Sequence, residues 1–317
     1  MTKRKMRITV SALSISFLAA LSLTLAGCGD KTTGNQPEAA AAAAKAKDLT
    51  PEEKFSETKR DAEAGNASAQ FLLGWMYANG DGVPKDSAKA VGWFQKAEAQ
   101  GDAGAQYSLG VMYAKGDGVP KDSAKAVEWL QKAAAQGSPA AQYMLGLMYA
   151  NGDGVPKDSA KAVEWFQNLA AQGDAEAQNH LGVMYAKGDG VPKDSAKAAE
   201  WYQKAAAQGN AGAQFNLGLL YVAGDGLPKD SAKAVEWYQK AAAQGHADAQ
   251  HNLGLMYWVG EGVSKNHVLA YAWLNLSAAQ GEDSSKELRD LVEKELTPAQ
   301  RGEGQSLSTN WKKGQVF

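Results

Sequence analysis

Hydrophobic and small residues become regularly spaced after residue 66 of the chain. The residues that stand three or four positions apart are Ala69, Leu73, Met76, Tyr77, Ala90, Trp93, Phe94 and Ala97. The first four would share one face of a helix and the last four one face of a second helix. Gly80-Asp81-Gly82-Val83-Pro84 lies between them and breaks the pattern. This stretch therefore predicts two helices joined by a loop.

The same pattern returns six times at a spacing of 36 residues. Its clearest markers are Gly74, Gly110, Gly146, Gly182, Gly218 and Gly254, and Trp93, Trp129, Trp165, Trp201, Trp237 and Trp273. A repeat of about 20–50 residues is typical of solenoids and propellers, and helical spacing favours the solenoid. The sequence predicts an all-α fold, a right-handed α-solenoid of six 36-residue helix-turn-helix repeats with N- and C-terminal capping helices.

Residues that favour helix ends stand where each helix should begin or stop. The expected N-caps of the first helices are Asn66, Asp102, Ser138, Asp174 and Asn210. Asp86 can cap the second helix in the same way, and Gly101 suits a left-handed C-terminal stop. These residues support two helices per repeat.

The start of the chain has the composition of a secretory signal. Residues 1–7 are basic, residues 8–25 are mostly apolar, and Leu25-Ala26-Gly27-Cys28 follows. These last four residues resemble the lipobox of bacterial lipoproteins, which implies cleavage before Cys28 and acylation of its thiol. By the same resemblance, Gly29 favours sorting to the outer membrane. An uncleaved membrane anchor is the alternative interpretation.

These patterns divide the chain into four expected segments. They are a lipoprotein signal peptide at 1–27, a flexible, alanine-rich tether at 28–53, the repeat solenoid at 54–281, and C-terminal capping helices with a tail at 282–317. A leading helix is expected at 54–64 and a capping pair at 282–311. Polar caps at both ends would keep a solenoid soluble.

The repeat unit resembles the Sel-one-like repeat, a relative of the tetratricopeptide repeat with a longer loop. The matching residues of the first copy are Ala69-Gln70, Leu73-Gly74, Tyr77, Gly80-Asp81-Gly82-Val83, Ala90, Trp93 and Ala97 through Gly101. The last copy departs from the pattern, because Ser264 replaces proline and His246 replaces the usual cap. The resemblance implies an adaptor or scaffold role in protein–protein interaction.

Composition excludes several functions. The formal net charge is −2, with 33 basic and 35 acidic residues, so the basic stripe typical of nucleic-acid binding is not expected. One cysteine excludes an internal disulfide and a multi-thiolate zinc site. The four histidines have no metal-ligand spacing, and no Ser/His/Asp or Cys/His arrangement stands out. No catalytic residue, metal or cofactor is therefore predicted.

The copies differ mainly in their first helices, whereas their second helices are almost identical. In solenoids of this kind the first helices line the concave side. We therefore predict partner contacts at the varied positions Phe71, Tyr107, Tyr143, Met144, His180, Phe215, Asn216, His251 and Asn252. Neutral drift after duplication would produce the same variation. The register tryptophans are predicted to be core residues rather than a sugar-stacking ladder.

The main hypothesis is a non-catalytic scaffold in the bacterial cell envelope. It would face the periplasm from the outer membrane, attached through the lipid on Cys28, and would bind an envelope protein or peptide on its concave face. A monomer is expected. The alternatives are a peptidoglycan-binding or regulatory lipoprotein and a passive spacer.

Overall fold

The fold is described for residues 49–317 of a computed structural model of the chain. This part contains fifteen α-helices and no strand, and residues 50–317 form one compact unit. The all-α solenoid prediction is confirmed. The expected signal peptide at 1–27, Cys28 and all but the end of the tether lie outside the described residues.

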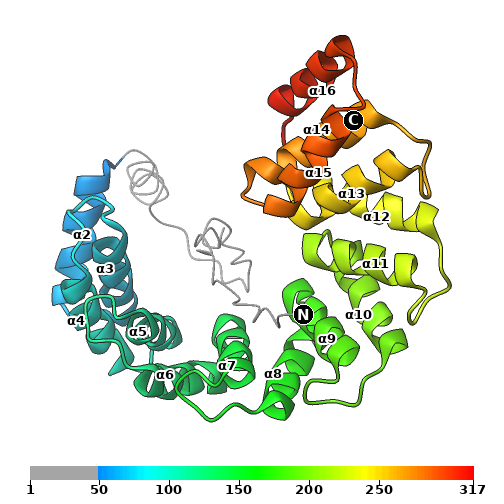
Figure 1. Cartoon of the computed structure of the whole chain (residues 1–317). Coiled ribbons are helices and arrows are strands. Elements are labelled where there is room, and N and C mark those ends of the chain that lie inside the picture. The colour runs from blue at the N-terminus through cyan, green and yellow to red at the C-terminus, as the bar shows by residue number, and fades with distance from the viewer. Residues whose placement is uncertain (1–48) are drawn as a thin grey trace, which may run out of the picture. The chain divides into compact units, whose positions relative to one another are not determined.

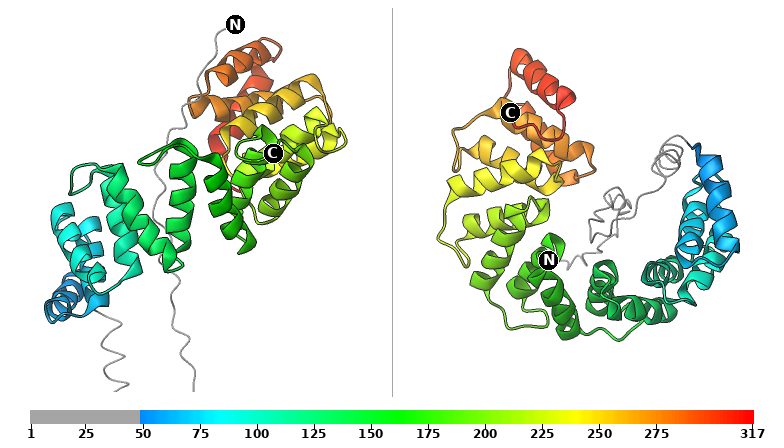
Figure 2. Two further views of the ribbon diagram at one scale, coloured as in Figure 1. Left: turned by 90° about the horizontal axis from the view of Figure 1, so that it is seen from below. Right: turned by 180° about the vertical axis from the view of Figure 1, so that it is seen from behind.

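Six helix pairs follow one another between two terminal caps. The helices are α2 (Pro51–Glu63), α3 (Ala67–Asn79), α4 (Ser87–Glu98), α5 (Ala103–Lys115), α6 (Ser123–Ala135), α7 (Pro139–Asn151), α8 (Ser159–Ala171), α9 (Ala175–Lys187), α10 (Ser195–Ala207), α11 (Ala211–Ala223), α12 (Ser231–Ala243), α13 (Ala247–Val259), α14 (His267–Ala279), α15 (Asp283–Glu293) and α16 (Pro298–Asn310). Within residues 50–317 the pairs follow a curve (Figures 1 and 2). The first helices, α3 to α13 with odd numbers, lie on its inner side, and the second helices, α4 to α14, lie outside.

The predicted helix ends are confirmed. Asn66 Oδ1 accepts a hydrogen bond from the Ala69 amide at 2.9 Å, and its counterparts Asp102, Ser138, Asp174 and Asn210 do the same in later repeats. In the sixth repeat the ring of His246 takes over this role, because its Nδ1 accepts from the Ala249 amide at 3.3 Å. Gly80 ends α3 in the left-handed region at φ +77°.

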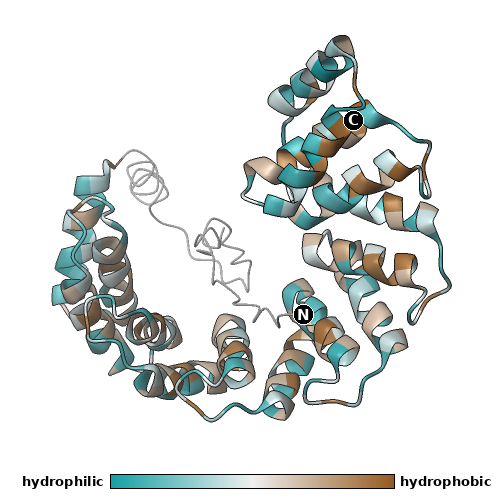
Figure 3. Ribbon diagram, viewed as in Figure 1, coloured by the Kyte–Doolittle hydropathy of each residue, from teal (hydrophilic) through white to brown (hydrophobic). Residues whose placement is uncertain are grey.

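Each repeat buries one leucine and brings its two helices together at a glycine. Leu73 and its five counterparts at 36-residue intervals are fully buried. A Cβ atom on Gly182 would lie 2.4 Å from the ring of Tyr202 on the second helix. Glycine is needed here because only a helix without a side chain lets the aromatic ring approach. Figure 3 shows the resulting alternation of hydrophobic and hydrophilic residues along the helices.

The register tryptophans pack against the core, as the sequence predicts, but most of them lie at its edge. Among the six, only Trp273 is fully buried, and the other five are half-buried. The residue that follows each tryptophan fills the core instead; these residues are Phe94, Leu130, Phe166, Tyr202, Tyr238 and Leu274. One residue turns a helix by about 100°, so the tryptophan points toward the junction with the preceding second helix.

The loop inside each repeat packs against the start of the preceding second helix. A Cβ atom on Gly118, which has φ +73°, would lie 2.3 Å from the carbonyl oxygen of Ser87. The equivalent glycines Gly154, Gly190, Gly226 and Gly262 make the same approach one repeat further on. This contact joins neighbouring repeats through backbone atoms, so any side chain at these glycines would force the repeats apart.

A pair of glutamines holds the ends of the two helices together in five of the six repeats. Gln136 Nε2, for example, donates to Gln106 Oε1 at 2.7 Å and to the Gly101 carbonyl at 3.0 Å. The other pairs are Gln100–Gln70, Gln208–Gln178, Gln244–Gln214 and Gln280–Gln250. Repeat 3 departs from this pattern, because Gln172 donates to the Asn168 carbonyl and the buried Oε1 of Gln142 has no partner within residues 49–317.

The N-terminal cap is α2, which occupies the position of a second helix next to the first repeat. Helix α2 begins at Pro51 rather than at residue 54, because Thr50 and Glu53 form a capping box around it. Helix α2 has polar residues at the positions that stand 36 residues before the buried Ala90, Phe94 and Ala97 of α4. These polar residues are Lys54, Thr58 and Asp61. The face that a first helix would cover is therefore polar, and it borders an open cavity of about 440 Å³ between α2 and α3.

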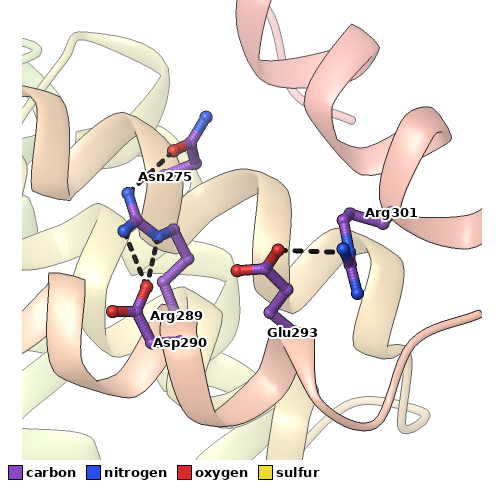
Figure 4. A network of polar contacts seen from close by, with 5 residues as sticks. All are labelled: Asn275, Arg289, Asp290, Glu293 and Arg301. Atoms are coloured by element: carbon purple, nitrogen blue, oxygen red, sulfur yellow. Dashed lines mark hydrogen bonds and ion pairs between the residues drawn. The ribbon is translucent and has the colours of Figure 1, made fainter. Parts of the chain in front are cut away.

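The C-terminal cap is a helix pair followed by a tail. Arg289 on α15 donates to Asn275 on α14 and pairs with Asp290, while Arg301 on α16 pairs with Glu293 at 3.1 Å (Figure 4). After α16 the tail folds back onto the last two repeats, where Gly314 donates its amide proton to the Ala243 carbonyl of α12 at 2.7 Å and the Phe317 ring lies 4.6 Å from that of Trp273 on α14. The end of the solenoid is thereby covered.

Candidate partner-binding surface

All nine predicted contact residues lie on the inner first helices, and all nine are half-buried. They occupy two neighbouring columns that run from repeat to repeat. The column of Phe71 points toward the second helix of its own repeat, since the Phe71 ring lies 5.8 Å from that of Phe94. Tyr143 and Phe215 make the same contact, each at 5.8 Å, with Phe166 and Tyr238.

The two columns also meet across the junctions between repeats. Tyr143 Oη and His180 Nε2 lie 2.9 Å apart, although they belong to repeats 3 and 4. One junction later, Asn216 Nδ2 donates to Asn179 Oδ1 at 3.2 Å. At these two junctions a residue of the first column forms a hydrogen bond with a residue of the second column in the next repeat. Part of the variation between copies therefore reflects these pairs.

The junction between repeats 3 and 4 brings aromatic rings and carboxylates together. The His180 ring stacks on Phe166 with centroids 4.9 Å apart, and burial lowers its pKa although Asp174 opposes this. Burial raises the pKa of Tyr143, with a further contribution from Glu176 and Asp174. Burial also raises the pKa of Glu176, again aided by Asp174. Burial at this junction therefore disfavours the charged form of the His180 ring.

The predicted contact His251 binds the C-terminal cap. Its Nδ1 lies 2.7 Å from Ser285 Oγ, which lies 2.7 Å from Ser277 Oγ. The sequence analysis did not predict this Ser–His pair, because Ser285 stands outside the repeats. Both serines are fully buried, so no substrate can reach Ser285 Oγ, and the pair fastens α15 to repeat 6.

A third column is also partly exposed and was not predicted residue by residue. Its members, one turn along the same helix face, are Trp75, Val111, Leu147, Val183, Leu219 and Leu255. Leu219 is 41% exposed and the others are half-buried. The sequence does contain a sign of this column, because its position is apolar in every copy. The position of the second column, by contrast, changes from Leu72 in the first copy to Asn252 in the last. Apolar side chains kept at a partly exposed position are typical of binding surfaces.

Other kinds of site find no support in the described residues. Within residues 49–317, no group of three or more His, Cys, Asp or Glu side chains could hold a metal ion. None of the helices in this range is long and apolar enough to cross a membrane.

The fold and this surface define a helical-repeat scaffold. The family model described as Sel1 repeat matches residues 67–102, 103–138, 139–174, 175–210, 211–246 and 247–282. The chain belongs to the Sel1 repeat family. Proteins of this family are helical scaffolds that often mediate protein–protein interaction and are generally non-catalytic.

The chain is also similar to several solved structures. A Sel1 repeat protein from Oxalobacter formigenes is 39% identical over 76% of this chain and 70% of its own, with a TM-score of 0.68. A protective antigen of uropathogenic Escherichia coli is 29% identical over 83% of this chain and 79% of its own, with a TM-score of 0.46. An immunity protein from Pseudomonas aeruginosa is 23% identical over 67% and 81%, with a TM-score of 0.43. No curated protein matches the chain.

Proposed function

We propose that this protein is a lipid-anchored scaffold of the bacterial cell envelope that binds a partner protein along its inner first helices. The observation that carries the proposal is the third column, which keeps an apolar side chain partly exposed in all six repeats. Paired columns beside it supply amide, imidazole and phenol groups. Together they resemble the mixture of apolar centre and polar rim found at protein interfaces.

The partner is expected to contact several repeats at once. Each repeat offers one apolar side chain of the column, from Trp75 to Leu255, and few charges interrupt it. A surface of this kind fits an extended or helical segment that carries apolar residues at intervals. The anchor on Cys28 would keep such a complex at the membrane, since lipidation adds membrane affinity to a soluble domain.

The binding proposal is tested by charge substitution on the column. Leu219→Asp places a carboxylate at a 41% exposed site and should abolish partner capture from envelope extracts without lowering helicity. Lys233→Asp on the outer α12 is the matched control. Capture that survives Leu219→Asp and Leu147→Asp would contradict the proposal.

The anchoring proposal needs a separate measurement. Cys28→Ala should release the protein from the membrane fraction and remove labelling by an alkyne-tagged fatty acid. Labelling that persists in this variant, or its absence in the natural chain, would contradict a lipid on Cys28.

A further inference from the structure

Trp165 differs from its counterparts on the outer second helices. In four other repeats a lysine Nζ lies 3.8–4.1 Å from the centroid of the register tryptophan; the pairs are Lys96–Trp93, Lys132–Trp129, Lys204–Trp201 and Lys240–Trp237. In repeat 3 the lysine position holds Asn168. No cation lies over the Trp165 ring within residues 49–317, although the ring is only half-buried.

The last repeat shows what else can cover this ring. Leu276 takes the lysine position there, and the tail covers the tryptophan instead. The Trp273 ring lies 4.6 Å from that of Phe317 and 6.5 Å from that of Trp311. The chain therefore covers a register tryptophan either with a cation or with an aromatic segment, and Trp165 has neither.

The residues next to Trp165 on the outer face of α8 are acidic or polar. The neighbouring Glu164 is exposed and, like its counterparts Glu128, Glu200 and Glu236, makes no ion pair in the described part of the chain. The Asn168 side chain is exposed, and Gln172 has turned toward the Asn168 carbonyl at 3.2 Å instead of joining Gln142. An uncovered indole beside an unpaired carboxylate favours a ligand that brings both an aromatic ring and a positive charge.

We propose that Trp165 is a docking platform for an extended segment of a partner protein in which an aromatic side chain stands next to lysine or arginine. The chain's own tail has this composition, with Trp311, Lys312 and Lys313 in sequence. The aromatic ring packs on Trp165 as the tail packs on Trp273, and the basic group lies near Glu164. The platform is on the outer helices, so it is independent of the inner surface proposed above.

The test uses the full chain with 15N-labelled tryptophan and a synthetic peptide of residues 311–317, Trp-Lys-Lys-Gly-Gln-Val-Phe. The indole N–H signal of Trp165 should shift on titration, with a Kd of about 1 mM or tighter. Asn168→Lys restores the lysine of the other repeats and should weaken binding about two- to fivefold. Trp165→Leu should abolish it, and Lys204→Asn should make Trp201 respond as a second site.

Three results would contradict the proposal that Trp165 is a docking platform. One is a Trp165 signal that does not move at several times that concentration, about 5 mM. Another is equal binding to the natural chain and to Asn168→Lys, a variant that retains helix propensity and leaves the core untouched. The third is a shift caused by a chitin oligosaccharide but not by the peptide, which would make the indole a sugar platform.

Discussion

The two helices of each repeat have different roles. Second helices join neighbouring repeats, whereas first helices carry the columns that are candidates for recognition. Second helices are nearly identical because each one packs against the preceding repeat through its tryptophan and supports a loop of the following repeat. First helices vary, but their columns vary in different ways. The Phe71 and Leu72 columns change in pairs across junctions, as Tyr143 and His180 do, whereas the Trp75 column stays apolar. Variation alone therefore does not mark a binding surface.

The largest expected effect separates core from surface within one helix. Leu145 is fully buried and Leu147, two residues away, is half-buried. Leu145→Ala should lower the free energy of unfolding by about 2–5 kcal/mol through loss of packing. Leu147→Ala should cost less than about 1 kcal/mol yet weaken partner capture. Urea unfolding and capture assays check both, and equal losses of stability would remove the distinction.

The second effect compares the cost of a steric contact between repeats with the cost of a left-handed backbone conformation alone. Gly154 and Gly173 both have positive φ, but only Gly154 would place a Cβ atom against Ser123, 2.2 Å from its carbonyl oxygen. Gly154→Ala should therefore destabilise more than Gly173→Ala, whose cost of about 1 kcal/mol reflects φ alone. We expect a difference of at least about 1 kcal/mol between the variants in thermal or urea unfolding. Similar values would show that the loops do not hold the repeats together.

A smaller effect tests the pairing of columns. Tyr143→Phe removes the hydroxyl that meets His180, and a double-mutant cycle with His180→Leu should give a coupling of about 1 kcal/mol. The same cycle for Tyr107 and His180, in repeats that are not adjacent, is the control. A coupling near zero for Tyr143 and His180 would leave neutral drift as the explanation of the variation.

The smallest effect is a dependence of stability on pH. Burial lowers the pKa of His180, His246 and His251 in the folded state below the ordinary value of about 6.5. The unfolded chain therefore binds more protons just below pH 6.5, so stability should fall as the pH falls from about 7 toward 5. His180→Asn should reduce this slope in urea unfolding. A slope that is flat or reversed in the natural chain would contradict buried neutral rings.

The sequence predicts the repeat and the helix caps because these depend on spacing and local hydrogen bonding, and the resemblance to the repeat family implies the inner position of the first helices. It could not decide between Trp93 and Phe94 as the core residue, since both lie within the apolar arc of one helix. Nor could it pair Tyr143 with His180 or turn Gln172 away from Gln142, because these contacts depend on how neighbouring repeats meet. The column of Leu219 needed the exposed fraction of each side chain before it could be distinguished from core.

The central claim is that a partner binds along the apolar column of the first helices. The most direct measurement is in-cell cross-linking from a photoreactive amino acid at Leu147, with Lys233 on the outer α12 as the matched position and mass spectrometry of the adducts. The account predicts one discrete protein adduct from position 147 and none from position 233. Equal adducts from both positions, or none from position 147, would contradict it.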